Sequence, residues 1–109
     1  MLGPLGRCTG FQWDSGNAPK VLERLSVGPG ECEQVLFVEP FLASADPAHS
    51  VAEARWRALG QTLAARKLHV VFTVRGDLIR VIAARDMSRR ERQVYEQAKA
   101  LEKDSDLQD

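Results

Sequence analysis

The stretch from residue 67 to residue 84 constrains the fold more than any other part of the sequence. Two runs, Lys67–Arg75 and Leu78–Ala84, are rich in β-branched residues, and only Gly76-Asp77 separates them. A glycine in the first position of a two-residue loop favours a type II′ turn, which joins antiparallel strands. The sequence therefore predicts a tight β-hairpin with strands over 67–75 and 78–84.

This turn also determines which residues of the two strands face each other. The expected pairs are Arg75 with Leu78, Thr73 with Arg80, Val71 with Ile82, and His69 with Ala84. One face is then wholly apolar and holds Leu68, Val70, Phe72, Val74, Ile79, Val81 and Ala83. The other face carries His69, Thr73, Arg75 and Arg80 among Val71 and Ile82. Helices must cover the apolar face, so we expect a binding site on the other one.

The remaining segments predict an α+β domain with the element order β-α-α-β-β-β-α. The expected elements are a strand at Phe11–Trp13, helices at 19–26 and from Pro29 to before Pro40, a loop over 42–50, a strand from Glu53 to Leu59, and a last helix opened by the capping box Ser88–Glu91. They give an antiparallel sheet of three to four strands, with the two N-terminal helices on one face and a C-terminal helix. We expect a flexible leader over 1–10, one domain over 11–103 and a frayed tail over 104–109.

The net charge of zero conceals a strongly basic segment in the middle of the chain. Residues 51–95 hold ten basic and four acidic side chains, a net charge of +6, and nine of the ten cations are arginine. The segments before and after it each carry a net charge of −3. Arginine presents a rigid fork of donors that suits phosphate. The segment therefore indicates either a phosphate-binding surface or a solvated face of salt-bridged arginines.

Several function classes lack the sequence features that they require. Cys8 and Cys32 do not have the spacing of metal ligands, and the chain has no P-loop and no H-E-x-x-H motif. No apolar run approaches the roughly 20 residues that a membrane helix needs. We therefore expect a cytoplasmic protein with reduced thiols, no cofactor and no metal. Cys32 is expected to be a small packed residue of a helix.

Arginines are the main candidates for chemistry. Arg80, Arg85 and Arg89 are expected to converge at one end of the sheet, where they would stabilise a phosphoryl-transfer transition state. The neighbouring strand is expected to bring Arg55 and Arg57 towards the same face. Further candidates for proton transfer or for orienting an arginine are Glu53, Glu91 and Tyr95, although Glu91 is expected mainly to serve the capping box with Ser88.

The two histidines each admit a functional and a structural interpretation. His49 lies in a loop, where it is either a general acid or base or ordinary polar surface. His69 is expected on the face that carries Thr73 and Arg80, either in a site or as a partly buried strand residue.

These residues together resemble a known family, the BrnT-type ribonuclease toxins. Phe11–Asp14 resembles the family's F-x-W-D opening, and Asp46–Ser50 with Glu53 and Arg55 resembles its D-x-x-H-S-x-x-E-x-R segment. Thr73–Arg85 is similar to T-x-R-G-D-x-I-R-I-I-S-A-R, and Arg90–Glu91–Arg92 with Tyr95–Glu96 to R-E-R-x-x-Y-E. The ordered set of motifs spans residues 11–96, nearly the whole domain.

The resemblance implies a RelE-like fold and an RNA endonuclease that needs neither metal nor cofactor. It implies catalytic roles for Arg80, Arg85, His49, Glu53 and Arg55, and we expect RNA contacts from Arg57, His69, Arg75, Arg89, Arg90 and Tyr95. It also implies an antitoxin partner, a ribbon-helix-helix protein through which the complex contacts DNA and represses its own operon.

The first helix departs from the family pattern. Asn17 stands where the family has a lysine, and Arg24–Val27 replaces a K-H-G-V run. A second hypothesis is therefore a weakened toxin that survives as an antitoxin-binding module of a repressor complex. A third is a basic RNA- or DNA-binding domain unrelated to toxins, which charge alone supports.

Overall fold

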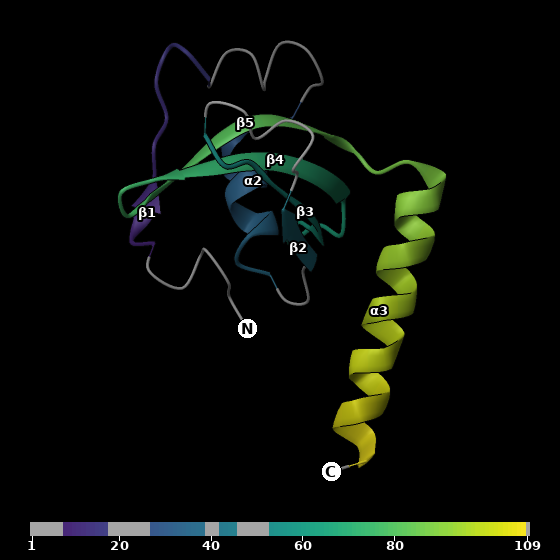
Figure 1. The fold of residues 1–109 in the computed structure, drawn as a ribbon. Helices are drawn as coiled ribbons and strands as arrows, with labels where there is room; N and C mark the ends of the chain where they lie inside the picture. Colours follow the sequence, from purple (N-terminus) through teal and green to yellow (C-terminus); the bar gives the residue numbers. More distant parts are fainter. Residues whose placement is uncertain (1–7, 18–26, 39–41, 46–52, 109) are drawn as a thin grey trace.

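The chain folds as an α+β domain around one five-stranded sheet (Figure 1). The computed structural model describes residues 8–17, 27–38, 42–45 and 53–108. The elements are β1 (Gly10–Phe11), α2 (Pro29–Val35), β2 (Leu42–Ala45), β3 (Trp56–Gln61), β4 (Lys67–Arg75), β5 (Leu78–Asp86) and α3 (Arg89–Gln108). The strand order is β1-β5-β4-β3-β2. The α+β class and the C-terminal helix are thus confirmed, and the helix expected over 19–26 lies outside the described residues.

Two parts of the predicted sheet are wrong. The sheet is mixed and has five strands, because β1 pairs with β5 in parallel while the other pairs are antiparallel. The segment expected to be a loop over 42–50 instead begins with β2, an edge strand paired with β3. Its sequence Leu-Ala-Ser-Ala contains small residues and three exposed positions, so it carries no strong alternation of apolar and polar residues.

The predicted hairpin is present, and its register holds from the turn as far as Phe72. Gly76 has a φ of 63°, and the pairs Arg75–Leu78 and Thr73–Arg80 are as expected. Beyond them a β-bulge interrupts the register between Val71 and Phe72, and Ile82 is the extra residue of β5. Val71 therefore pairs with Ala83 and His69 with Arg85, which corrects the predicted pairs of Val71 with Ile82 and His69 with Ala84.

The bulge also corrects the predicted core, since it exchanges the faces of the residues that follow it. Ala84 is buried and Ala83 is exposed, the reverse of the expectation. The other predicted core positions of the hairpin are buried, except Val74, which is partly buried and packs against the core. The same exchange turns Arg85 to the face that carries His69.

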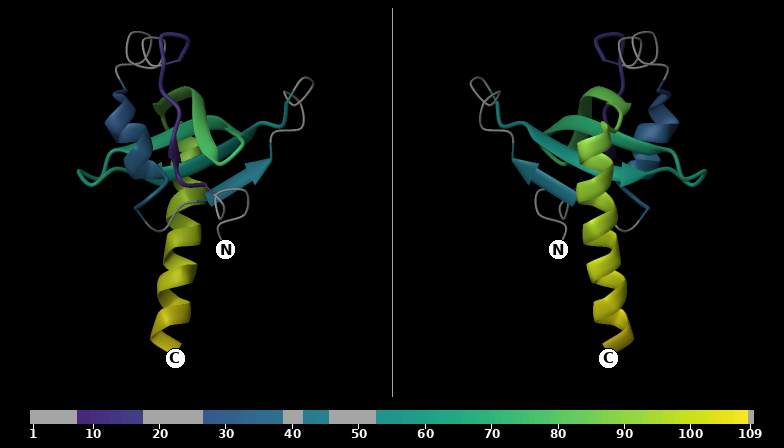
Figure 2. Two further views of the ribbon diagram at one scale, coloured as in Figure 1. Left: turned by 90° about the vertical axis from the view of Figure 1, so that its left-hand side faces the viewer. Right: turned by 90° about the vertical axis from the view of Figure 1, so that its right-hand side faces the viewer.

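Helix α2 covers the apolar face of the sheet (Figures 1 and 2). It begins at Pro29 behind Gly28, whose backbone N–H donates to the Glu31 carboxylate over 3.0 Å. Cys32 and Val35 are fully buried in the core, as expected for Cys32, and burial raises the pKa of its thiol to about 12. Arg66 ties this helix to the end of β5, with ion pairs to Glu31 (3.1 Å) and Asp86 (2.9 Å).

Helix α3 begins at the end of β5, and its C-terminal part projects away from the sheet (Figures 1 and 2). Its earlier part is anchored by an ion pair between Lys67 and Glu96 (2.7 Å) and by a hydrogen bond from Lys99 to Gln61 (3.3 Å). The described residues include no helix long and apolar enough to cross a membrane.

The buried side chain of Asn17 holds the turn after β1 against the sheet. Its amide donates to the carbonyl oxygens of Gln12 and Val81, each over 3.0 Å, and its side-chain oxygen accepts from the Asp14 N–H over 2.9 Å. We expect Asn17→Ala to lower the free energy of unfolding by about 2–3 kcal/mol, because it leaves buried polar groups without partners. Urea denaturation tests this, and Ser15→Ala in the exposed part of the same turn should change stability by less than about 0.5 kcal/mol.

Candidate functional site

The face of the sheet opposite α2, here called the open face, brings polar side chains of four strands together. The pairing aligns Leu42, Leu59, His69 and Arg85 in one cross-strand row, and Ser44, Arg57, Val71 and Ala83 in the next. Side chains of directly paired residues share a face and lie about 5 Å apart. Residues from four strands that are distant in the sequence thus form one continuous surface.

Arg85 joins this surface to the start of α3 through Glu91. Its two terminal nitrogens donate to the two carboxylate oxygens of Glu91 over 2.6 and 2.9 Å. The same carboxylate accepts from the Ser88 N–H (2.8 Å), while the Ser88 hydroxyl accepts from the Glu91 N–H (3.2 Å), which confirms the predicted capping box. The Arg85 bond is the main reason that the pKa of Glu91 falls to about 2, so this carboxylate stays ionised.

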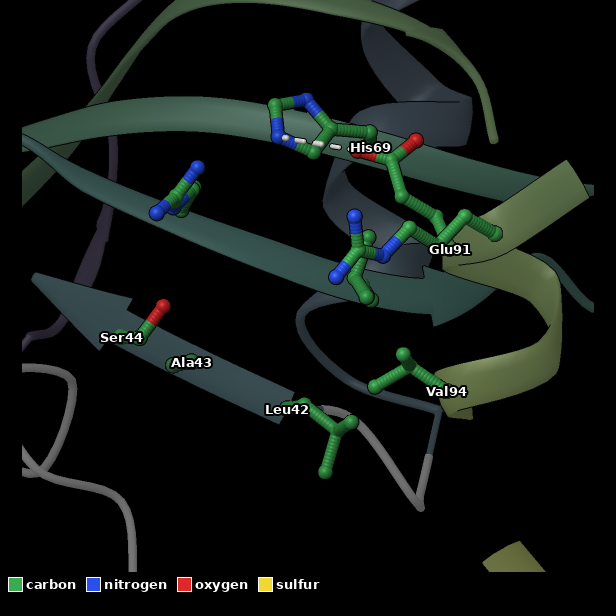
Figure 3. A pocket seen from close by; sticks show the side chains of 9 residues that line it. Leu42, Ala43, Ser44, His69, Glu91 and Val94 are labelled. Carbon is green, nitrogen blue, oxygen red and sulfur yellow. Dashed lines mark ion pairs between the residues drawn. The ribbon is translucent and has the colours of Figure 1, made fainter. Parts of the chain in front are cut away.

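A cavity of about 520 Å³ opens where the open face meets α3 (Figure 3). The cavity is lined by Leu42, Ala43, Ser44, Arg57, Leu59, His69, Arg90, Glu91 and Val94. Its apolar walls come from β2, β3 and α3, and its charged groups are the cations of Arg57 and Arg90 and the carboxylate of Glu91. The size falls in the usual range of ligand sites, roughly 300–1,000 Å³.

Two arginines of this cavity are available to a ligand. Among the residues that the structure describes, no carboxylate forms an ion pair with Arg57 or Arg90. Arg57 is exposed on β3, and Arg90 is exposed in the first turn of α3. Cations in a first turn oppose the helix dipole, and an anion bound beside them relieves that repulsion.

His69 lies in the cavity wall, with its side chain 11% exposed and its Nε2 atom 3.8 Å from a Glu91 oxygen (Figure 3). Burial, followed by the positive charge of Arg85, lowers the pKa of the imidazole, and the negative charge of Glu91 opposes this shift. The ring is therefore neutral at pH 7 and able to accept a proton.

A second cluster, here called the hairpin cluster, lies nearer the turn. Arg80 is only 14% exposed and makes a two-pronged ion pair with Asp14 (2.7 and 3.2 Å). Arg75 binds Glu53 in the same way (3.0 and 3.2 Å), and this bond lowers the pKa of the Glu53 carboxyl, as do the charges of Arg55 and Arg80. These arginines are therefore held by carboxylates.

The structure does not gather Arg80, Arg85 and Arg89 around one point. Arg80 and Arg85 point to the same face but lie five residues apart on β5, about 16 Å at 3.3 Å per residue. Arg80 is bound to Asp14, Arg85 to Glu91, and Arg89 is exposed at the start of α3. The expectation of convergence missed both the bulge and the carboxylate partners.

The other predicted site residues fall into separate places. Glu53, Arg55 and Arg75 belong with the hairpin cluster, while Arg57, His69 and Arg90 line the cavity. Tyr95 is fully buried, which favours a packing role over RNA contact. His49 lies outside the described residues.

Sequence reasoning missed the contribution of β2 and the role of Asp14. Leu42, Ala43 and Ser44 line the cavity, but their segment resembles a loop in sequence. Asp14 was visible only as part of a motif, and no local signal links it to Arg80, 66 positions later. No three His, Cys, Asp or Glu side chains of the described part of the chain are grouped as metal ligands.

Comparison with known proteins identifies the family. The model of the ribonuclease toxin BrnT of type II toxin–antitoxin systems matches residues 13–91. The chain belongs to the BrnT family. No curated protein matches the chain. The matched segment includes Arg57, His69, Arg85 and Glu91, and thus the strands and the ion pair that form one side of the cavity.

The BrnT family consists of ribonuclease toxins of type II toxin–antitoxin systems, which implies an antitoxin partner. The BrnT match ends at Glu91, so it covers only the first turn of α3.

Because of the Arg85–Glu91 pair, we expect the free energy of unfolding of this BrnT-family domain to depend on pH in the acid range. The pKa of Glu91 is lower in the folded chain than its ordinary value of 4.5, so the pair stabilises the fold above about pH 4.5 and is lost as the pH falls towards 2. Glu91→Gln should destabilise the protein at pH 7 and weaken the loss of stability between pH 4.5 and 2.

Chemical denaturation at a series of pH values measures this effect. Glu96→Gln is the matched control, because Glu96 lies on the same helix and its pair with Lys67 is more exposed. We expect the control to cost at most about 1 kcal/mol at pH 7. Equal effects of the two substitutions would contradict a special role for Glu91.

Proposed function

We propose that this chain is an active RNA endonuclease of a type II toxin–antitoxin system, and that it cleaves RNA at the open face without a metal ion. One observation carries the proposal: the cavity beside α3 combines the cations of Arg57 and Arg90 with an apolar wall and with His69. Single-stranded RNA is bound by such combinations, in which cations contact phosphates and apolar or aromatic groups contact the bases.

The cavity provides a distinct role for each type of side chain. Arg57 and Arg90 bind phosphate oxygens, while Leu42, Leu59 and Val94 contact a base or ribose. Arg85 offsets the negative charge of Glu91, so the cavity keeps the positive charge of Arg57 and Arg90. Preorganised cations of this kind stabilise the charge that develops on phosphorus during cleavage.

The hairpin cluster extends the positive surface along the open face. Arg80, Arg75 and Arg55 carry three positive charges against the two negative charges of Asp14 and Glu53. We propose that a longer RNA strand continues over this cluster and that Arg80 exchanges Asp14 for a phosphate there. Arg85, Arg80, Glu53, Arg55 and His49 remain the proposed catalytic residues, and Arg89 a proposed contact outside the cavity.

The antitoxin is proposed to be a ribbon-helix-helix protein that neutralises the toxin by covering the open face. In this proposal the toxin contacts DNA only through the antitoxin. The ion pair that occupies Arg80 favours a second candidate, a weakened toxin that serves as an antitoxin-binding module, because this cation is already neutralised in the free chain.

Controlled expression in a bacterium tests the first candidate against the second. We expect growth arrest together with breakdown of bulk RNA, and relief of both by Arg80→Ala, because the variant removes the cation that is proposed to exchange Asp14 for a phosphate of the RNA strand. Denaturation curves must show that the variant is folded. Folded, soluble chain that neither arrests growth nor degrades RNA would contradict the toxin and leave the antitoxin-binding module.

Salt dependence of RNA binding separates the cavity arginines from other cations. Each phosphate contact with a single strand contributes about 0.7 to the slope of log K against log salt concentration. Arg57→Gln and Arg90→Gln should each reduce the magnitude of the slope by about that amount, as measured by fluorescence anisotropy with an RNA oligonucleotide. Arg92→Gln removes the same charge from α3 outside the cavity and should change the slope little.

A further inference from the structure

Few of the described side chains that line the cavity beside α3 can transfer a proton near neutral pH. Arginine stays protonated at any physiological pH, so Arg57 and Arg90 cannot take up a proton. Glu91 has both carboxylate oxygens occupied by Arg85 and a pKa of about 2, which makes it a poor base. The hydroxyl of Ser44 does not ionise near neutral pH. Among the described residues that line the cavity, His69 is therefore the side chain that can exchange a proton at pH 7.

We infer that His69 is the catalytic base of this chain and accepts the proton of the RNA 2′-hydroxyl during cleavage. This inference rests on the proposed ribonuclease function and adds the group that activates the nucleophile. The position of His69 supports the inference. His69 lies in the cavity wall, between Leu59 and Arg85 in one cross-strand row, and Arg57 lies in the next row. A phosphate bound by Arg57 would bring its neighbouring ribose to the imidazole.

The proposed step is a transesterification that needs no further reactant than water. His69 takes the proton from the 2′-hydroxyl, the 2′-oxygen forms a bond to the adjacent phosphorus, and the bond from phosphorus to the 5′-oxygen breaks. The leaving 5′-oxygen takes a proton from water, and His69 later returns its proton to water. The products end in a 2′,3′-cyclic phosphate and a 5′-hydroxyl.

Glu91 acts on His69 as a positioning residue. Its oxygen lies 3.8 Å from Nε2, so protonation of the ring creates an ion pair that stabilises the imidazolium formed in the step. The capping box and Arg85 hold this carboxylate in place from α3 and β5. The charged groups of the described residues that act on the ring are Arg57 on β3, Arg85 on β5 and Glu91 on α3.

Together these groups keep the ring neutral at rest. Burial and the two arginines disfavour the imidazolium more than Glu91 favours it, so the pKa of His69 lies below its ordinary value of 6.5. A base whose pKa lies below 6.5 is deprotonated at pH 7 and can therefore accept a proton.

Cleavage of a defined single-stranded RNA by the purified full chain tests the inference. We expect His69→Gln to lower kcat by 10²- to 10⁴-fold, the usual contribution of general base catalysis, with the Kd for RNA changed by less than about threefold. The kcat/KM of the unaltered chain should rise with pH along a limb whose midpoint lies below 6.5, and His69→Gln should lack this limb. Arg57→Gln should move the limb to higher pH, since it removes a positive charge near the ring.

A second measurement keeps the inference falsifiable if His69→Gln does not fold. The sequence has two histidines, so His49→Gln leaves a single imidazole signal in the NMR spectrum, that of His69. The pKa of this signal should match the midpoint of the kinetic limb. An RNA with a 2′-deoxyribose at the cleaved position should resist cleavage, and the products of normal RNA should carry the cyclic phosphate.

The outcomes distinguish failure of the proposed ribonuclease function from failure of His69 as its base. A folded chain that does not cleave RNA overturns the ribonuclease function and the base together. Cleavage that persists in His69→Gln with an unchanged pH profile overturns the base alone. Products with a 5′-phosphate, or an NMR pKa that differs from the kinetic midpoint by more than one unit, also overturn the base and leave the ribonuclease intact.

Discussion

The ion pair between Arg85 and Glu91 is the contact on which the site depends. It joins the end of β5 to the first turn of α3 and holds Glu91 in the wall of the cavity. The same carboxylate caps the helix and faces His69. The Glu91 side chain thus has two roles, since it caps the start of α3 and also contributes to the charge of the open face.

The two clusters of the open face differ in how their arginines are used. In the hairpin cluster Arg75 and Arg80 are each bound by a carboxylate through two hydrogen bonds, an arrangement that orders the surface before any ligand arrives. Beside the cavity Arg85 is bound in this way, whereas Arg57 and Arg90 in its wall have no carboxylate partner among the described residues. This difference is the reason that phosphate is proposed to bind in the cavity, while the hairpin cluster is proposed to guide the RNA strand.

Local patterns in the sequence were sufficient for the hairpin, the helix α3 and its cap. Gly76-Asp77 predicts the turn and Ser88–Glu91 the helix start, because both depend on residues within a few positions of each other. The bulge could not be predicted, since Ile82 and Ala83 are both apolar and suit either face of a strand. The pairing of β1 with β5 and the bond of Arg80 to Asp14 depend on tertiary contacts between distant segments, which residue patterns do not reveal.

The position of Arg85 illustrates a limit on how such a site can change. Its face is decided by the number of residues in β5 and not by their types, because the extra residue Ile82 shifts every later position by one. We expect deletion of Ile82 to restore the regular register of β5 and to turn Arg85 towards the core face of the sheet. A mutational library without insertions and deletions leaves the length of β5 unchanged, so it does not sample the strand without its extra residue.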